Sequence, residues 1–288
     1  MRTVTLAATQ SACSWDIPAN LDTAERLVRE AAAKGANVIL IQELFATPYF
    51  CLTEDPAHFA LAAPFEGNPL IARFAALARE LGVVLPIPFF ERAGQAHFNS
   101  AALADADGRI LGLYRKAHIP QGVGYEEKFY FSPGDTGLPV WETAFGTVGL
   151  GICWDQWFPE LARAMVLKGA EMLLYPTAIG SEPATPGYDS QPHWEATMRG
   201  HAAANILPLV AANRIGREDQ GGRFIDFYGS SFIADNAGQL AAKAPRDAEA
   251  VLTAAFDLDA IGDLRRSWGV FRDRRVDLYG PLLRYDGN

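Results

Sequence analysis

The sequence predicts an α/β protein with mixed sheets, and three observations support that fold class. Strand-like and helix-like segments alternate through the first half of the chain, as they do where helices pack on sheets. The run over 38–41 is apolar throughout, which is typical of a strand covered on both faces. The run over 110–115 instead alternates as a hairpin strand does, so both parallel and antiparallel pairing are expected.

The individual elements follow from hydrophobic spacing and from helix start and stop signals. A helix is predicted over 20–34, because its apolar residues share one face, Asn20 can cap its start and Gly35 can end it. A second helix, over 69–81, is stopped by Gly82. The same criteria predict helices over 160–168 and 193–205, and strands over 3–9, 38–41, 83–89, 100–104, 110–115, 148–153, 172–175, 209–212, 230–234 and 251–256.

Breaks in these patterns indicate an irregular strand and two long loops. Pro86 and Pro88 favour an edge strand or a bulge, because proline has no N–H to donate to a sheet. The segments 176–192 and 214–228 are predicted to be long loops, which in compact domains are usually functional or mobile. No linker or repeat divides the chain, so residues 1–288 are predicted to form one domain.

The composition argues against several classes of function. Hydrophobic residues make up 49% of the chain and charged residues 20%, which are values of a globular protein. The net charge of −9 argues against binding to nucleic acid or anionic membranes, which depends on clustered positive charge. No stretch approaches the roughly 20 apolar residues of a membrane span. The cysteines, which form no Cys-x-x-Cys pair, predict neither disulfides nor structural zinc and favour a cytoplasmic location: Cys13, Cys51 and Cys153.

Three strand-like runs end in side chains that carry chemistry. Glu43 follows the first of them, Lys116 the second and Cys153 the third. The carboxyl ends of strands are where α/β sheets usually bind ligands. Gly149 and Gly151 alternate within the third run and predict a close approach of neighbouring groups. Each of the three reactive residues alone has an ordinary structural explanation, but together they predict one site.

A thiol, a carboxylate and an ammonium at one rim can hydrolyse an amide-type bond. The thiolate attacks the carbonyl carbon, the carboxylate moves the proton to the leaving amine, and the ammonium stabilises the oxyanion. A Cys–His pair is the rival interpretation, and it stays open because five histidines are available as spatial partners: His58, His97, His118, His193 and His201. No metalloprotease, phosphate-loop or serine-hydrolase motif is present, so neither a metal nor an organic cofactor is expected.

These motifs, in this order, resemble those of the nitrilase (carbon–nitrogen hydrolase) superfamily. The segment 39–45 resembles its glutamate motif, 114–120 its lysine motif and 149–155 its cysteine motif. The likeness runs from Ala7 to about Tyr279, which is nearly the whole chain. It implies a four-layer α-β-β-α sandwich and subunits that assemble into a homodimer or a higher homo-oligomer.

The resemblance also implies roles for individual residues. Cys153 is expected to be the nucleophile, Glu43 the general base and Lys116 the oxyanion stabiliser. The backbone N–H of Trp154 is expected to be the second oxyanion donor. A further carboxylate that recurs in the family matches Glu127, which is expected to orient Lys116 or the substrate nitrogen.

Within the superfamily the chain most resembles the branch of N-carbamoylputrescine amidohydrolases of polyamine biosynthesis. The segments that carry this likeness are 47–51, 122–131, 177–183 and 193–201. In that branch an acidic and an aromatic residue meet the distal ammonium of the substrate, and the matching positions here are Glu182 and Tyr49. Val123 stands where the branch commonly has proline, a change that we expect to be tolerated.

The charge pattern independently favours a small cationic carbamoylated amine as the substrate. Enzymes that bind a carboxylate-bearing substrate usually use arginine. No arginine follows Cys153 over 154–158, and neither lysine nor arginine occurs over 169–198, where Glu182 lies. Three other acidic residues near the expected site are predicted to be solvated: Glu126, Asp189 and Glu195.

Alternative functions stay open at this point. A β-ureidopropionase-like or ω-amidase-like hydrolase, or an enzyme for a longer carbamoylated diamine, would share the chemistry and differ at the far end of the substrate. A catalytically silent subunit used for assembly or regulation is a rival of another class, although such a protein would be expected to lack one of the three reactive residues. The last residues, 277–288, are expected to be a tail that contacts a partner subunit.

Overall fold

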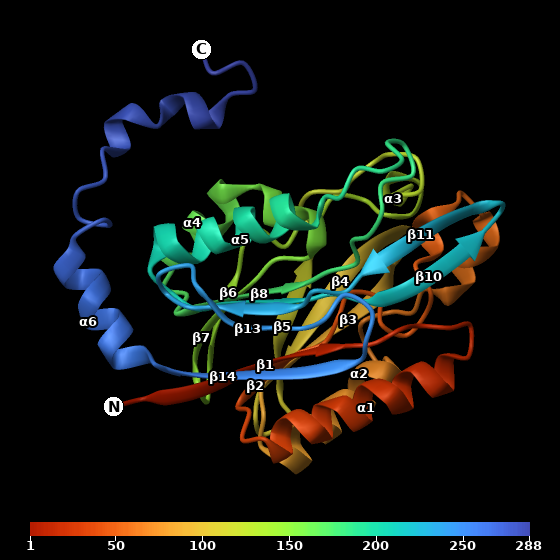
Figure 1. Ribbon diagram of the computed structural model, residues 1–288, viewed down its shortest axis with the longest axis horizontal. Helices are drawn as coiled ribbons and strands as arrows, with labels where there is room; N and C mark the ends of the chain where they lie inside the picture. The colour runs from red at the N-terminus through yellow and green to blue at the C-terminus, as the bar shows by residue number, and fades with distance from the viewer.

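Two β-sheets lie face to face between two layers of helices in the computed structural model, which describes all residues from 1 to 288 (Figure 1). Two helices cover the first sheet, α1 (Ile17–Ala33) and α2 (Pro69–Leu81), and two cover the second, α4 (Pro159–Leu167) and α5 (Gln191–Asn205). The predicted four-layer α-β-β-α sandwich is therefore confirmed. Two more helices are α3 (Glu127–Tyr130) and α6 (Leu258–Trp268).

The first sheet is built from two three-stranded parts. One has the order β14-β1-β2 and the other β3-β4-β5. Backbone hydrogen bonds join them between β2 and the start of β3, from Ile39 N to Val84 O (3.0 Å) and from Val84 N to Asn37 O (2.8 Å). The strands are β1 (Thr3–Gln10), β2 (Val38–Leu40), β3 (Leu85–Ala93), β4 (Ala96–Ala104), β5 (Ile110–Arg115) and β14 (Ala250–Asp257).

The second sheet has six strands in the order β13-β12-β9-β8-β7-β6. Strands β7, β8 and β9 run parallel to one another, and the outer pairs are antiparallel, so the prediction of mixed sheets is confirmed. Its strands are β6 (Val140–Thr143), β7 (Gly146–Leu150), β8 (Met172–Pro176), β9 (Leu209–Ala212), β12 (Phe232–Ala234) and β13 (Leu240–Lys243).

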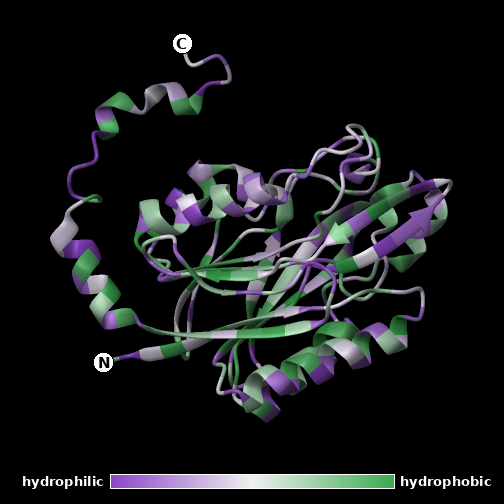
Figure 2. Ribbon diagram, viewed as in Figure 1, coloured by the Kyte–Doolittle hydropathy of each residue, from purple (hydrophilic) through white to green (hydrophobic).

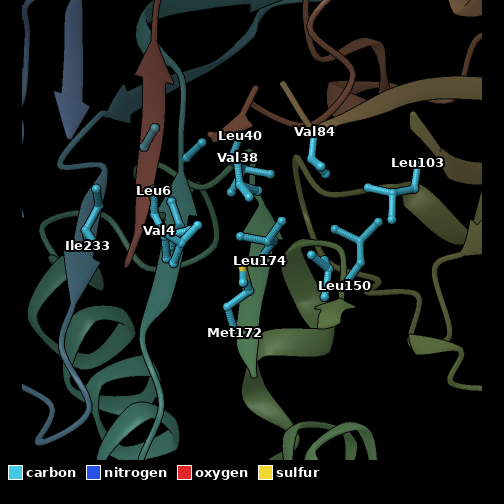
Figure 3. Close-up of a cluster of buried hydrophobic side chains, with 14 of the residues drawn as sticks. Val4, Leu6, Val38, Leu40, Val84, Leu103, Leu150, Met172, Leu174 and Ile233 are labelled. Carbon is cyan, nitrogen blue, oxygen red and sulfur yellow. The ribbon is translucent and has the colours of Figure 1, made fainter. Parts of the chain in front are cut away.

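The main hydrophobic core fills the space between the two sheets (Figure 3). Leu6 and Leu40 from the first sheet belong to the same buried cluster as Leu150 and Leu174 from the second, and Cys153 lies in that cluster too. Separate buried clusters attach the helices to the outer sheet faces. Figure 2 shows hydrophobic residues concentrated in the strands, whereas α1 and α5 carry both hydrophobic and hydrophilic residues, as amphipathic helices do.

The start of the first helix differs from the prediction. Helix α1 begins at Ile17, and the Asp16 side chain accepts a hydrogen bond from Ala19 N as its cap. Asn20 lies one turn inside the helix, where its buried amide donates to the carbonyls of Ser14 (2.6 Å) and Ala46 (2.9 Å). Aspartate and asparagine are both good caps, and the sequence pattern did not separate them.

The predicted loop over 214–228 is wrong. Its residues form a two-stranded hairpin of β10 (Ile215–Gln220) and β11 (Arg223–Tyr228). Gly221 and Gly222 make the turn with φ of +56° and +77°. A Gly-Gly pair between two strand-like runs is a known hairpin signal. The edge-strand prediction is confirmed only within the part β3-β4-β5, because β3 pairs along its length with β4 alone but also meets β2 at its start.

The chain after α6 projects from the two sheets but still contacts α4, where the ring of Phe271 packs against the guanidinium of Arg163. Residues 269–288 extend away from the two sheets and contain two short 3₁₀ turns, η4 (Val276–Leu278) and η5 (Gly280–Leu283) (Figure 1). The side chains of Leu283 and Tyr285 are fully exposed there. None of the helices combines the length and the apolar character that a membrane span requires.

Candidate active site

The three predicted reactive residues meet at one end of the space between the sheets. Glu43 follows β2, Lys116 follows β5, and Cys153 begins the 3₁₀ turn η3 (Cys153–Trp157) just after β7. Glu127 joins them from the first residue of α3. A cavity of about 410 Å³ opens beside them, and both Cys153 and Glu127 lie on its wall.

The buried ammonium of Lys116 bridges two buried carboxylates. Its Nζ lies 2.9 Å from Oε1 of Glu43 and 2.6 Å from Oε2 of Glu127. All three side chains are at most 1% exposed. Two of the three N–H groups of the ammonium are therefore occupied, and the third has no hydrogen-bond partner. Desolvated charges of this kind cost several kcal/mol each unless they are paired, so each member depends on the others.

The cluster changes the proton affinity of its members. Burial alone would lower the pKa of Lys116, but the charges of Glu127 and Glu43 outweigh it and raise that pKa well above its usual value. The lysine is therefore a permanent cation. Burial raises the pKa of Glu127 to about 7, although Lys116 and Tyr49 oppose the rise. The charge of Glu127 therefore changes near neutral pH.

Cys153 stands on a strained turn at the end of a strand. Its φ is +44°, a left-handed conformation that is uncommon for residues other than glycine. The close approach predicted at Gly151 is confirmed, because a Cβ there would lie 2.8 Å from the ring of Tyr175. The thiol is oriented toward the carbonyl of Ala178, at an Sγ–O distance of 3.7 Å. Burial, followed by the charge of Glu43, raises the thiol pKa well above its usual value, so a base is needed to form the thiolate.

Asp155 ties the cysteine turn to the strand that carries the lysine. Its carboxylate accepts the Tyr114 hydroxyl at 2.7 Å and the backbone N–H of His118 at 2.9 Å. These two residues lie on either side of Lys116 along the chain, and Asp155 itself is completely buried. Hydrogen bonds from neighbouring residues therefore fix the segment that carries Cys153 relative to the segment that carries Lys116.

None of the histidines hydrogen-bonds to Cys153. The ring of His118 lies 2.8 Å from Asp155, that of His201 lies 2.7 Å from the carbonyl of Gln156, and His58 contacts Tyr130. The rings of the other two, His97 and His193, make no hydrogen bond. His193 lines the cavity. The structure therefore gives no support to the Cys–His pair. It also contains no group of three or more His, Cys, Asp or Glu side chains that could hold a metal ion.

Two of the three predicted substrate-binding residues line the cavity. Trp154 is 38% exposed at its mouth and Glu182 lies on its wall. Burial raises the pKa of Glu182, although a hydrogen bond with Ser190 opposes the rise. Tyr49 is the exception, because it is fully buried and its hydroxyl donates to Glu127 at 2.7 Å. Other aromatic residues line the cavity in its place, namely Tyr125, Trp157 and Tyr188.

Two acidic residues predicted to be solvated are buried and paired instead. Glu126 is 9% exposed and forms an ion pair with Arg223 at 2.9 Å. Glu195 is also 9% exposed and pairs with Lys243 at 2.5 Å. Asp189 is half exposed, as predicted, although it pairs with Arg246 on the surface. Their partners come from later in the chain, which leaves Glu182 as the acidic residue of this region without a cationic partner.

Sequence reasoning missed several residues that build the site. They are buried and polar, and they hydrogen-bond to the reactive residues, to the segments that carry them or, for Asn213, to Ile179 on the cavity wall: Asn99, Asp155, Asn213 and Arg214. Each occurs in or next to an apolar run. Because buried polar groups in proteins are almost always hydrogen-bonded, a polar residue at such a position is the signal that could have identified them.

Two sheets stacked between helices, with a cysteine, a lysine and two glutamates gathered at one end, define the nitrilase class of fold. The family model described as carbon-nitrogen hydrolase matches residues 4–266, and the chain belongs to this family. The protein is accordingly a hydrolase that acts on carbon–nitrogen bonds.

Individual relatives resemble the chain over its whole length. An N-carbamoylputrescine amidase from Arabidopsis thaliana is 60% identical, with 100% of this chain and 97% of the relative covered. A citrullinase from Francisella tularensis is 49% identical, with 99% of each covered. The crystal structure of a carbon-nitrogen hydrolase from Helicobacter pylori superposes with a TM-score of 0.90 at 41% identity, and it covers 98% of this chain and 99% of its own.

Proposed function

We propose that this protein hydrolyses N-carbamoylputrescine to putrescine, ammonia and carbon dioxide, with Cys153 as the nucleophile. The observation that carries the proposal is the charge of the cavity. Cys153 and Glu127 lie on its wall together with Glu182, and no lysine or arginine lines it. Such a cavity suits a substrate with a carbamoyl group at one end and an ammonium at the other. The 60% identity to an N-carbamoylputrescine amidase supports the same substrate.

The first half of the reaction forms a carbamoyl thioester. Glu43 takes the proton of the Cys153 thiol as the sulfur attacks the ureido carbon. The carbonyl oxygen becomes an oxyanion, which the free N–H of Lys116 and the backbone N–H of Trp154 stabilise. The C–N bond then breaks, and Glu43 returns its proton to the departing amine. The thiol pKa, which burial raises, explains why the reaction needs a base beside the nucleophile.

The second half releases the carbamoyl group. A water molecule gives a proton to Glu43 and attacks the thioester carbon. The tetrahedral intermediate occupies the same two oxyanion donors and then collapses, and the sulfur leaves with the proton held by Glu43. The carbamic acid product decomposes to an amine and carbon dioxide. Glu127 keeps Lys116 in place through the 2.6 Å contact during both halves.

Substrate choice follows from the far end of the cavity. N-carbamoylputrescine places an ammonium where Glu182 can pair with it. β-Ureidopropionate and glutaramate carry only a carboxylate at that end, which the cavity meets with Glu182 and with no cation. Citrulline carries an ammonium and a carboxylate there, so Glu182 can pair with the first while the second finds no cation on the wall. A desolvated carboxylate without a partner costs several kcal/mol, so these compounds should be poor substrates.

Ammonia release from these four compounds at equal concentration tests the proposal. We expect strong preference for N-carbamoylputrescine and, in the same samples, putrescine as the second product. Cys153→Ala should be folded and inactive, whereas Cys13→Ala should keep its activity. Turnover by Cys153→Ala would contradict the mechanism, and preference for a carboxylate compound would contradict the substrate while leaving the mechanism intact.

We also propose that the chain forms one domain whose C-terminal tail contacts a second copy in a homo-oligomer. The exposed side chains of Leu282, Leu283 and Tyr285, on a segment that leaves the body, support this proposal. Light scattering of the full chain and of a chain ending at Arg275 tests it. We expect the full chain to be oligomeric and the shortened chain to be a smaller species; a monomeric full chain would contradict the proposal.

A further inference from the structure

The carboxylate of Glu43 uses its two oxygens very differently. Oε1 accepts from Lys116 Nζ at 2.9 Å and from the side-chain amide of Asn99 at 2.6 Å. Oε2 is buried and has no hydrogen-bond partner. Most buried polar atoms in proteins are hydrogen-bonded, and an exception within a cluster of reactive groups has free lone pairs that can bind a proton, water or ligand. The unpartnered oxygen is thus the one available for proton transfer.

Asn99 is held in place by its strand. It lies in β4, opposite Phe90 of β3, and its backbone carbonyl accepts the N–H of Lys116 at 2.8 Å. Asn99 is therefore in contact with the main chain of Lys116 and with the carboxylate of Glu43. Its side chain is completely buried, so water does not replace its hydrogen bond when that bond is lost.

The direction of the Asn99 amide is set by Glu43 alone. Its Oδ1 has no partner, so only the Nδ2–H···Oε1 contact orients the group. An ionised carboxylate accepts hydrogen bonds and donates none, so only the amide nitrogen of Asn99 can meet it. A hydrogen bond donated to a charged carboxylate is about twice as strong as one between neutral groups, and it favours the ionised form.

We propose that Asn99 is a positioning residue that holds Oε1 of Glu43 together with Lys116 and so makes Oε2 the acceptor of the proton from the Cys153 thiol. With Lys116 and Asn99 both bonded to Oε1, that oxygen is saturated and the free lone pairs belong to Oε2. Without Asn99 the carboxylate can turn and share its charge with Lys116 through either oxygen. This inference rests on the proposed function, because it assigns a partner to the proposed general base.

Alkylation of Cys153 by iodoacetamide gives a test that needs no substrate. The rate is followed from pH 5 to 9 by mass spectrometry of the peptide that contains Cys153. In Asn99→Leu, which lacks the donor, we expect the rate at pH 7 to fall at least about tenfold and the rising limb of the profile to move to higher pH. Steady-state kinetics should show the same loss in kcat with KM changed less than about threefold.

Asn99→Asp gives a signature that a structural role does not produce. The introduced carboxyl group can donate to Glu43 as the amide does while it is protonated, but it repels Glu43 once it is ionised. The alkylation rate of this variant relative to wild type should therefore rise as the pH falls, whereas that of Asn99→Leu should fall. If Asn99→Leu does not fold, Asn99→Asp alone still tests the role of Asn99. Ser100→Ala is the matched control, because Ser100 is equally buried in β4 and donates to Glu91 at 2.6 Å.

The outcomes separate the two proposals. Variants of Asn99 that keep the wild-type profile, or that lose the same factor at every pH, would overturn the role of Asn99. If the protein does not hydrolyse N-carbamoylputrescine but the Asn99 variants change the alkylation rate as expected, the proposed substrate is wrong and the role of Asn99 stands. A change in the control as large as that in Asn99→Leu would show that any buried change in β4 has this effect, and would also overturn the inference.

Discussion

The hydroxyl of Tyr49 donates to Oε1 of Glu127 at 2.7 Å, so a residue expected to meet the substrate instead supports the second carboxylate of the cluster. Glu127 uses its other oxygen to hold Lys116 at 2.6 Å. The chain Tyr49–Glu127–Lys116 is buried throughout. It connects the segment after Glu43 to the proposed oxyanion donor, and it makes the ionisation of Glu127 depend on a neighbouring phenol.

Tyr49→Phe should shift the pH dependence of activity. The Tyr49 hydrogen bond lowers the pKa of Glu127, so its loss should raise that pKa further above its present value of about 7. Since ionised Glu127 orients Lys116, the acidic limb of kcat against pH should move to higher pH. The activity at pH 9 should stay within about threefold of wild type. An unchanged limb would show that Glu127 does not control it.

Glu127→Gln should change how stability depends on pH. The pKa of Glu127 is raised from 4.5 to about 7 in the folded state, so between those values the native state holds a proton that the unfolded state has lost. Stability contributed by this group therefore falls as the pH rises through that window. In the variant this falling contribution should vanish, as urea unfolding at a series of pH values between 4 and 8 would measure. If the free energy of unfolding falls with pH as steeply in the variant as in wild type, Glu127 is not the group responsible.

Glu182→Gln should weaken the binding of a cationic substrate. We expect KM for N-carbamoylputrescine to rise about tenfold, which corresponds to about 1.4 kcal/mol, with a smaller change in kcat. Because burial raises the pKa of Glu182, the wild-type KM should itself rise on acidification, and the variant should lack this dependence. Asp189→Asn is the control, since Asp189 lies in the same region and pairs with Arg246. Equal KM values for Glu182→Gln and Asp189→Asn would show that the substrate ammonium does not bind at Glu182.

Arg214→Met should destabilise the protein and reduce its turnover. The buried guanidinium donates to the carbonyls of Glu43 at 2.7 Å and Leu44 at 3.1 Å, and it pairs with Glu218 at 2.8 Å. Its loss leaves the buried carboxylate of Glu218 with the backbone N–H of Tyr49 but without a cation, and breaking a buried ion pair typically costs about 3–5 kcal/mol of unfolding free energy. Denaturant unfolding measures this. Arg217→Met, which removes an exposed pair with Asp226, should leave the midpoint unchanged.

Much of the fold was predictable because its signals are local. The helix over 69–81 and the apolar strands were recognised from spacing and from terminating glycines, and the structure places them there. Helix α6 was missed although Asp257 caps its start and Gly269 ends it. Strands were missed as well, among them β6, β13 and the hairpin after Arg214. These strands are short or carry polar residues, and their pairing is set by neighbours in the sheet and not by their own pattern.

The placement of single polar residues was less predictable. Glu126 and Glu195 were predicted to be solvated, yet they are paired with Arg223 and Lys243, which lie 97 and 48 positions later in the chain. Sequence spacing carries no information about such partners, because the contact exists only after distant segments have packed together.

The sequence by itself determined the α/β class and the position of Glu43, Lys116 and Cys153, the three proposed reactive residues, just after strands, because each follows from a short run of residues. The tertiary structure alone decided which groups touch. It bonded Tyr49 to Glu127, Asn99 to Glu43 and Arg214 to the main chain after β2, across separations of 78, 56 and 171 positions. The physical reason is that hydrogen bonds depend on distances below about 3.2 Å, which only the packing of the two sheets fixes.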